Sequence, residues 1–231
     1  MMISNPVFSE VIDPRLELIE NTKDLRYADL KHMDLKNKDL SGADLYGANL
    51  SGADLYGANL SGADLTNAKL FGSVLQYAIL TDAILNNADL SGANIYEADF
   101  ENADLSGASL RHTYSYKTKF FNAILTNADF SSANFCGQLL SGKDLSGSNL
   151  SDADLHRANL SYANLTKTIL TGTDLREATL HGANISGNDL SNALLSGANL
   201  SNANLANTIL IGADLRNANL TNAVLTNADL S

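Results

Sequence analysis

Few residues in this sequence could ligate a metal ion or act as a nucleophile, and those few lie far apart. The histidines are His32, His112, His156 and His181, and no two of them have the spacing of a metal-binding pair. Cys136 is the single cysteine, and neither of its neighbours is a histidine or an asparagine that could help to form a thiolate. The sequence therefore predicts no catalytic, metal-binding or cofactor-binding residues, no disulfide framework, and a passive surface thiol.

Carboxylates are abundant, but their positions follow a repeat rather than a catalytic pair. Of the 26 acidic residues, 17 are aspartates that occupy the same position of a five-residue repeat. Paired carboxylates then recur along the chain as a consequence of the repeat, so they do not indicate general acid–base catalysis. We expect a protein that is not an enzyme.

The composition restricts the partners and the location of the protein. The 231 residues include only 15 Lys and Arg, which gives a formal net charge of −11 and argues against direct binding to nucleic-acid phosphates. The apolar runs are a few residues long, far short of a membrane span. The first residues lack the basic and apolar segments of a secretory signal, so we expect a cytoplasmic protein.

The element that positions all these side chains is a five-residue repeat whose central residues run from Leu25 to Leu230. Of the 42 central positions, 35 are Leu, six are Ile or Phe, and one is Ser115. We number each repeat from its centre, i. Position i−2 is usually Ala, position i−1 is usually Asp or Asn, and all 16 glycines stand at i+2.

A short extended segment followed by a turn is the backbone that fits this pattern. Residues five apart scatter around an α-helix and alternate between the two faces of a strand. In a short extended segment, i and i−2 point to the same side, and a turn at i+2 suits Gly and Asn, which accept positive φ. Repeated turns in one direction keep the Leu and Ala columns inside a solenoid of stacked coils.

The pattern A(D/N)LXX, as in Ala43-Asp44-Leu45 and Ala198-Asn199-Leu200, resembles the repeat of the pentapeptide-repeat family. The resemblance covers residues 23–231 and implies an all-β fold, a right-handed quadrilateral β-helix with four repeats per coil and about 10 coils. It implies a structural or protein-interaction solenoid, since many bacterial members have no known biochemical activity. The alternative is a DNA mimic, because some members bind DNA gyrase or topoisomerase IV. The net charge of −11 is small beside the roughly 30 phosphates of a duplex as long as the expected rod.

The two ends of the chain lead to two further predictions. Residues 1–22 lack the repeat, and Asp13-Pro14 is typical of a helix N-cap followed by proline at the first helical position. A short helix that covers the first coil is expected there, with a disordered tail as the alternative. The repeats continue to Leu230 without a cap, so the last coil should expose apolar side chains and unpaired backbone. This predicts an end-to-end homodimer through the C-terminal coil.

Six residues depart from the small side chain that belongs at i−2. A lysine cannot lie unpaired in a narrow apolar interior, so the two N-terminal lysines should splay the first coil or reach out of its open end. A second pair of departures, at successive repeats in the middle of the array, predicts a local distortion of the corner, and a kink in the solenoid or a site there is the alternative. The six positions are Lys23, Met33, Lys38, Gln138, Lys143 and Asn188.

Residues 111–119, RHTYSYKTK, are the clearest break in the repeat. The irregular residues of this coil are Arg111, His112, Ser115, Lys117 and Lys119. With four repeats per coil, residues 20 apart lie above one another, which gathers five tyrosines on one side: Tyr56, Tyr77, Tyr96, Tyr114 and Tyr116. Tyrosine combines apolar area with a polar tip and is enriched at interfaces, so this side is the candidate surface for an unidentified protein partner. The alternative is a tyrosine ladder that only stabilises the coils.

Overall fold

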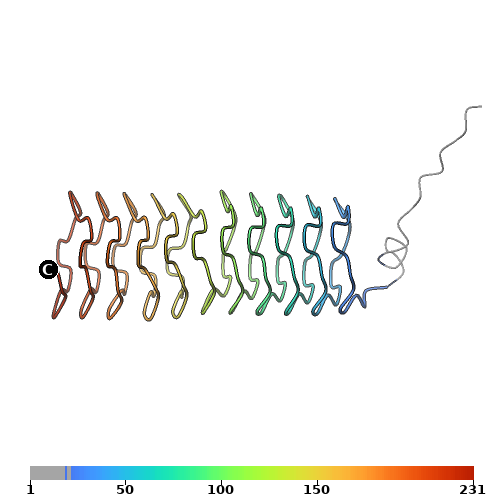
Figure 1. Cartoon of the computed structure of the whole chain (residues 1–231), viewed down its shortest axis with the longest axis horizontal. Helices are drawn as coiled ribbons and strands as arrows, with labels where there is room; N and C mark the ends of the chain where they lie inside the picture. Colours follow the sequence, from blue (N-terminus) through green and yellow to red (C-terminus); the bar gives the residue numbers. More distant parts are fainter. Residues whose placement is uncertain (1–18, 20–21) are drawn as a thin grey trace, which may run out of the picture.

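Four repeats make one coil of the solenoid. A computed structural model describes Ile19 and residues 22–231. Isolated parallel β-bridges join i−1 residues that are 20 positions apart, from Asp24 with Asp44 to Ile209 with Asp229. Because each repeat has five residues, this spacing closes a coil after four repeats and stacks the next coil in register (Figure 1). Each extended segment contributes a single bridge residue, so within the described part of the chain the sheet faces are built from bridges rather than from longer strands.

Every corner of the solenoid falls at i+2. From Tyr27 to Asn227 each i+2 residue has a positive φ, between 51° and 74°. Glycine reaches this region without steric cost and asparagine does so more easily than most residues, which explains why these two types dominate the corners. The N–H of residue i+3 closes the turn by donating to the carbonyl of residue i, as from Ala48 to Leu45 at 2.9 Å. The predicted corner position is confirmed.

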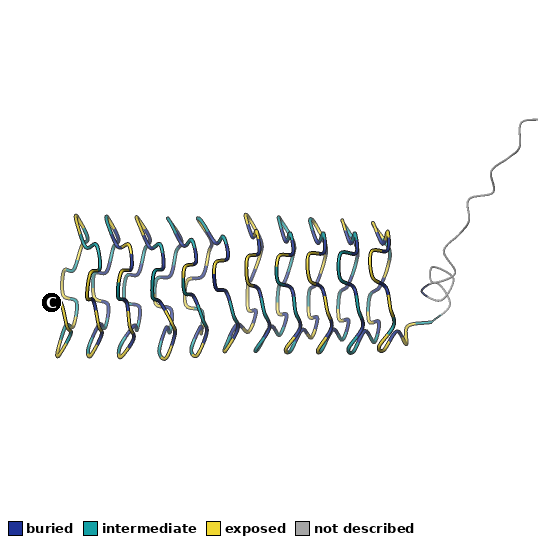
Figure 2. Ribbon diagram, in the orientation of Figure 1, coloured by how far each residue is buried: buried dark blue, intermediate teal, exposed yellow. Residues whose placement is uncertain are grey.

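The interior consists of two columns of small and large apolar side chains. The central Leu residues and the i−2 Ala residues are buried along nearly the whole array, whereas the turns are exposed (Figure 2). Burial of one leucine side chain contributes about 2 kcal/mol to folding. The alanines leave room for the leucines of the four faces to meet around the axis.

Ser115 is the one polar residue in the central column, and its neighbours compensate for the missing volume. Its hydroxyl donates to the carbonyl of Asn134 at 2.7 Å, so the buried oxygen is satisfied. Phe135 lies one coil further on the same face and stacks on Phe120 with ring centroids 5.8 Å apart. An aromatic ring therefore stands next to the position where a leucine is lost, and the core stays closed.

The Asp or Asn at i−1 holds the turn that follows it. Its Oδ1 accepts a hydrogen bond from the backbone N–H two residues on, as from Ser41 to Asp39 at 3.0 Å and from Ser61 to Asn59 at 3.1 Å. The hydrogen bonds from Ser41 also hold the pKa of Asp39 below its ordinary value. Because a carboxylate and an amide both offer this oxygen, the repeat accepts either residue. Many of the negatively charged aspartates therefore have a structural role in the turns.

The ends of the solenoid differ from its middle. The predicted N-terminal helix falls almost entirely outside the described residues; Ile19 is helical and buried with the core cluster. At the other end Leu215, Leu220 and Leu225 are half-buried and Leu230 is exposed. Among the described residues no helix is long and apolar enough to cross a bilayer.

Candidate functional site

Five tyrosines on one side of the rod contact one another in an unbroken series, which we call the tyrosine face. The ring centroids are 5.3 Å apart for Tyr56–Tyr77, 5.6 Å for Tyr77–Tyr96, 5.9 Å for Tyr96–Tyr116 and 6.3 Å for Tyr96–Tyr114. The first two pairs meet edge to face and the last two are stacked. The five tyrosines predicted to share one side therefore form a single cluster of side chains in contact.

The tyrosine face is apolar in its body and polar at its edges. Four of its rings are between 40 % and 45 % exposed, and Tyr96 is half-buried at the centre of the series. A hydrogen bond to the Glu97 carboxylate raises the pKa of Tyr96 to about 12, so this phenol stays protonated and remains a donor at neutral pH. Half-exposed rings with fixed hydroxyl groups are the type of surface that binds protein partners.

The irregular coil adds charged groups beside the tyrosine face. Lys117 Nζ lies 3.3 Å from Glu97 Oε1 and 5.5 Å from the centroid of the Tyr116 ring. Lys119 Nζ lies 2.9 Å from Asp99 Oδ2, and this carboxylate raises the pKa of Lys119. These two ion pairs join the irregular coil to the coil before it.

The remaining residues predicted for the irregular coil lie apart from these ion pairs. Arg111 Nε approaches Asp129 Oδ2 at 3.9 Å on the coil that follows, and His112 is an exposed corner. Ser115 is buried in the core. The irregular coil thus brings its two lysines to the tyrosine face but does not assemble all five residues into one site.

The junction after the irregular coil has lost its backbone ladder. Elsewhere adjacent coils are joined by bonds such as Leu105 N to Ile124 O at 2.9 Å. Between residues 117–125 and 136–144, all of which the structure describes, no backbone-to-backbone hydrogen bond crosses. The β-bridges of Lys119 with Leu139 and of Ile124 with Asp144 are missing from a series that, among the described residues, otherwise lacks only the bridge of Ile169 with Asp189. Figure 1 shows a wider gap at this level, between the green and the yellow-green coils. We call this junction the open joint.

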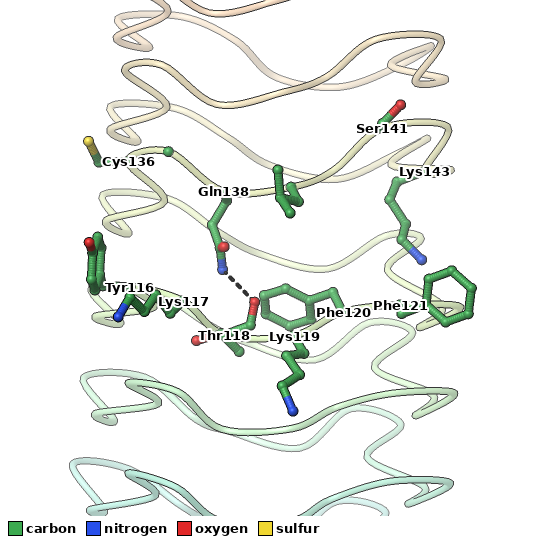
Figure 3. A pocket seen from close by; sticks show the side chains of 12 residues that line it. Tyr116, Lys117, Thr118, Lys119, Phe120, Phe121, Cys136, Gln138, Ser141 and Lys143 are labelled. Carbon is green, nitrogen blue, oxygen red and sulfur yellow. Dashed lines mark hydrogen bonds between the residues drawn. The ribbon is translucent and has the colours of Figure 1, made fainter.

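Two long i−2 side chains hold the open joint apart. Gln138 is buried, and its Nε2 donates to the carbonyls of Ser115 at 2.8 Å and of Thr118 at 3.1 Å (Figure 3). The regular pattern would give the Thr118 carbonyl to the N–H of Leu139. The side-chain amide has taken the place of the ladder bond. The corners at Gly137 and Gly142 keep regular φ values of 69° and 67°, so the distortion lies between the coils and not at the corners, where it was predicted.

Lys143 has the same effect on the next face. Its Nζ approaches the carbonyl of Ala123 at 3.5 Å, which is the oxygen that the N–H of Asp144 would use in a regular coil. Because two successive i−2 residues are long, two successive faces lose their ladder bonds.

The open joint leaves a groove of about 720 Å³ that sequence reasoning did not identify (Figure 3). Phe120, Phe121 and Leu139 supply its apolar wall. Lys117, Lys119 and Lys143 also line it, and no carboxylate stands among the lining residues, all of which are described. The signal that could have found the groove is the pair of large polar residues at successive i−2 positions.

The other departures at i−2 have milder consequences. Lys23 is exposed and its Nζ donates to the carbonyl of Asp39 at 3.1 Å, so it reaches out of the open end as expected. Lys38 is half-buried, and Met33 is buried within its coil. Asn188 is buried, and its Nδ2 donates to the carbonyl of Leu165 and to Thr168 Oγ1.

The histidines and Cys136 are the residues from which metal binding or nucleophilic attack would be expected. Within the described residues no group of three His, Cys, Asp or Glu side chains could hold a metal ion. Cys136 is half-buried, and burial raises the pKa of its thiol, which disfavours the nucleophilic thiolate.

Comparison with known proteins establishes the class. The family model described as pentapeptide repeats matches in eight copies, over residues 24–62, 48–87, 63–102, 98–135, 128–166, 158–197 and 198–231. The chain therefore belongs to the pentapeptide-repeat family. Its solved neighbours are pentapeptide-repeat proteins, which makes the fold a right-handed β-helix.

Among solved structures the chain is similar to HetL, a pentapeptide repeat protein involved in heterocyst differentiation regulation from the cyanobacterium Nostoc sp. strain PCC 7120. The two share 36 % identity over 88 % of this chain and 90 % of HetL, with a TM-score of 0.77. Rfr23 from the cyanobacterium Cyanothece 51142 shares 29 % identity over 55 % of this chain and 91 % of its own, with a TM-score of 0.45. QnrB1, a plasmid-mediated fluoroquinolone resistance protein, shares 21 % identity over 85 % and 92 % of the two chains, with a TM-score of 0.45. No curated protein matches the sequence.

Proposed function

We propose that this chain is a non-enzymatic interaction protein that binds a protein partner through the tyrosine face. The observation that carries the proposal is the unbroken contact series of five tyrosines, four of them between 40 % and 45 % exposed. Tyrosine offers a large contact area with few rotatable bonds, and interface residues of this kind carry much of the binding energy.

The similarity to HetL supports a regulatory rather than a catalytic role. HetL is described as involved in the regulation of differentiation, and it matches this chain along most of both sequences. A regulator built on a rigid solenoid acts by occupying a partner's surface, which requires a fixed pattern of side chains and no reactive group. The cytoplasmic location inferred from the sequence stays a prediction.

A double variant separates binding from stability at the tyrosine face. We expect Tyr96→Ser with Tyr116→Ser to lose partners that the unaltered protein captures from an extract of its source cells, with little change in melting temperature. Tyr162→Ser is the matched control, since Tyr162 is exposed and contacts His181 on another side of the rod. Unchanged capture together with a lower melting temperature would favour the stabilising ladder and overturn the proposal.

The DNA-mimic alternative requires a continuous acidic stripe. The i−1 aspartates are distributed as five on each of three faces and two on the fourth, and many of their carboxylates accept hydrogen bonds from their own turns. We therefore do not favour it. A DNA gyrase supercoiling assay tests it directly, and inhibition at micromolar protein would restore this alternative.

We also propose that the C-terminal coil mediates an end-to-end homodimer. The supporting observation is the exposure of Leu230 and the partial exposure of the central leucines of that coil. Light scattering at high protein concentration should give twice the chain mass, and Leu220→Lys with Leu230→Lys should return the monomer. A monomer before substitution would reject the dimer.

A further inference from the structure

The groove of the open joint combines an apolar wall with two strongly exposed apolar side chains. Phe121 is 65 % exposed and Leu139 is 74 % exposed, and both line the groove beside the buried ring of Phe120. Position i−1, which Leu139 occupies, is usually Asp or Asn in this chain. An apolar residue at this position, next to an opening, provides a surface that an apolar ligand could cover.

Lys143 is the lysine of the groove that lacks an acidic partner. Lys117 and Lys119 are paired with Glu97 and Asp99 on the preceding coil. Lys143 is half-buried, its contact is the carbonyl of Ala123 at 3.5 Å, and among the described residues no carboxylate forms an ion pair with it. Burial lowers the pKa of Lys143. A partly buried ammonium group has lost part of its hydration, and no neighbouring anion compensates for that loss. A bound carboxylate would stabilise the charge.

Two backbone donors beside the same opening lack their ladder bonds. In a regular junction the N–H of Phe120 would donate to the carbonyl of Leu139, and the N–H of Leu139 would donate to the carbonyl of Thr118. Neither bond forms in the open joint. These two N–H groups are thus available to an acceptor that enters the gap, and a backbone donor on an anionic oxygen makes a strong hydrogen bond.

We propose that this groove binds a small amphipathic monocarboxylate, an aliphatic or aromatic acid whose apolar body covers Phe121 and Leu139 and whose carboxylate bonds to Lys143 Nζ and to the free N–H groups of the open joint. A volume of about 720 Å³ is in the range of small-ligand sites, which are mostly apolar with a few converging polar groups. The acidic character of the chain does not oppose such a ligand, because the groove is lined by three lysines and no acid. The groove shares Tyr116 with the tyrosine face, and the two proposals are distinguished at residues that only one of them uses.

The test uses octanoate and 3-phenylpropionate as ligands, with octanamide and 3-phenylpropanamide as neutral matches. Binding to the full chain is measured by isothermal titration calorimetry and by ligand-observed NMR. We expect saturable binding of the acids, and affinity at least about tenfold weaker for the amides, because a hydrogen bond between charged groups is lost.

Three variants locate the site. Lys143→Met removes the charge, and Met33 shows that methionine is accommodated at i−2 in this solenoid; we expect affinity to fall at least about tenfold. Lys167→Met removes the same charge outside the groove and should leave affinity unchanged. Gln138→Ala with Lys143→Ala restores the repeat's own residue at both positions, so the joint should close and binding should disappear while the protein stays folded.

Several outcomes would overturn the proposal. They are the absence of saturable binding of the acids by the unaltered chain, equal affinity for the amides, unchanged affinity in Lys143→Met, and an equal loss in Lys167→Met. Tyr96 does not line the groove, so Tyr96→Ser should leave carboxylate affinity unchanged. The failure of the tyrosine-face proposal can therefore be told apart from the failure of the groove proposal.

Discussion

Two neighbouring junctions of the solenoid are built from the same repeat yet differ in their backbone bonds. Below the irregular coil, Phe100 N donates to Lys119 O at 2.9 Å and Lys119 N donates to Ala98 O at 3.0 Å. Above it, in the open joint between 117–125 and 136–144, no such bond forms. The i−2 residues that enter the two junctions explain the difference, since the lower one receives Thr118 and Ala123 and the upper one receives Gln138 and Lys143.

The length of the i−2 side chain therefore decides whether two coils close. Thr118 is polar and buried, but its hydroxyl reaches the carbonyl of Ile95 at 2.6 Å without displacing a backbone donor. The side chain of Asn188 is longer than that of Thr118. The β-bridge expected between Ile169 and Asp189 is missing at this position, while the neighbouring faces keep their bridges. One long residue opens one face, and two at successive repeats open two faces and create the groove.

The largest effect is expected from building a second open joint. Ala98→Gln with Ala103→Lys places the same pair of side chains two coils before the natural one. Displaced ladder bonds and an overfilled core should lower the free energy of unfolding by about 3–5 kcal/mol, measured by urea denaturation. Ala98→Thr with Ala103→Thr is the control, because hydroxyl groups keep the ladder in this chain. An equal loss in the control would mean that polarity, not length, opens the coils.

Closing the natural open joint should raise the free energy of unfolding, by less than a second open joint lowers it. Gln138→Ala with Lys143→Ala should raise the free energy of unfolding by about 2 kcal/mol, since regained backbone bonds outweigh the side-chain bonds that are lost. Amide hydrogen exchange should slow at Phe120, Leu125 and Leu139. If these amides exchange as fast as before, the long side chains fill a gap that another cause has opened.

Asn188 should give a still smaller effect because it opens a single face. Its Oδ1 is buried without a hydrogen-bond partner, which is a cost that a shorter residue avoids. Asn188→Thr should raise the free energy of unfolding by about 1 kcal/mol and slow the exchange of the Leu170 and Asp189 amides. Thr208→Ser, at an i−2 position with a closed ladder, is the control and should leave the exchange of its neighbours unchanged.

The sequence predicts the regular coils and the tyrosine face far better than it predicts the open joint. The repeat places leucine, alanine and the i+2 corners. The four repeats per coil that the family resemblance implies then bring Tyr56, Tyr96 and Tyr116 to one face. Gln138 was recognisable as a misfit, but a misfit has two outcomes. A polar side chain at i−2 can add a hydrogen bond beside the backbone ladder, as Thr118 does, or take the place of a ladder bond, as Gln138 does. Which of the two happens depends on the length of the side chain. The groove forms only where a ladder bond is replaced, so the sequence alone did not indicate that Phe121 and Leu139 line a groove.

The smallest effect should come from the ion pairs of the lower junction, and it tests whether charge rather than side-chain length closes the coils. Lys117 with Glu97 and Lys119 with Asp99 cross the closed junction. Exposed ion pairs contribute little to stability and are screened by salt. Lys117→Ser with Lys119→Ser should therefore leave the melting temperature nearly unchanged and the Phe100 amide protected from exchange.

The pH dependence of stability tests independently whether these ion pairs hold the lower junction closed. Hydrogen bonds from Tyr96 and Lys117 lower the pKa of Glu97, so any stability that this carboxylate adds is present above its ordinary pKa and is lost as the pH falls through the lowered value. The small loss of stability as the pH falls through this lowered pKa should shrink in the double serine variant. Rapid exchange of the Phe100 amide in that variant, or in high salt, would show that the ion pairs hold the lower junction closed and that its difference from the open joint is electrostatic.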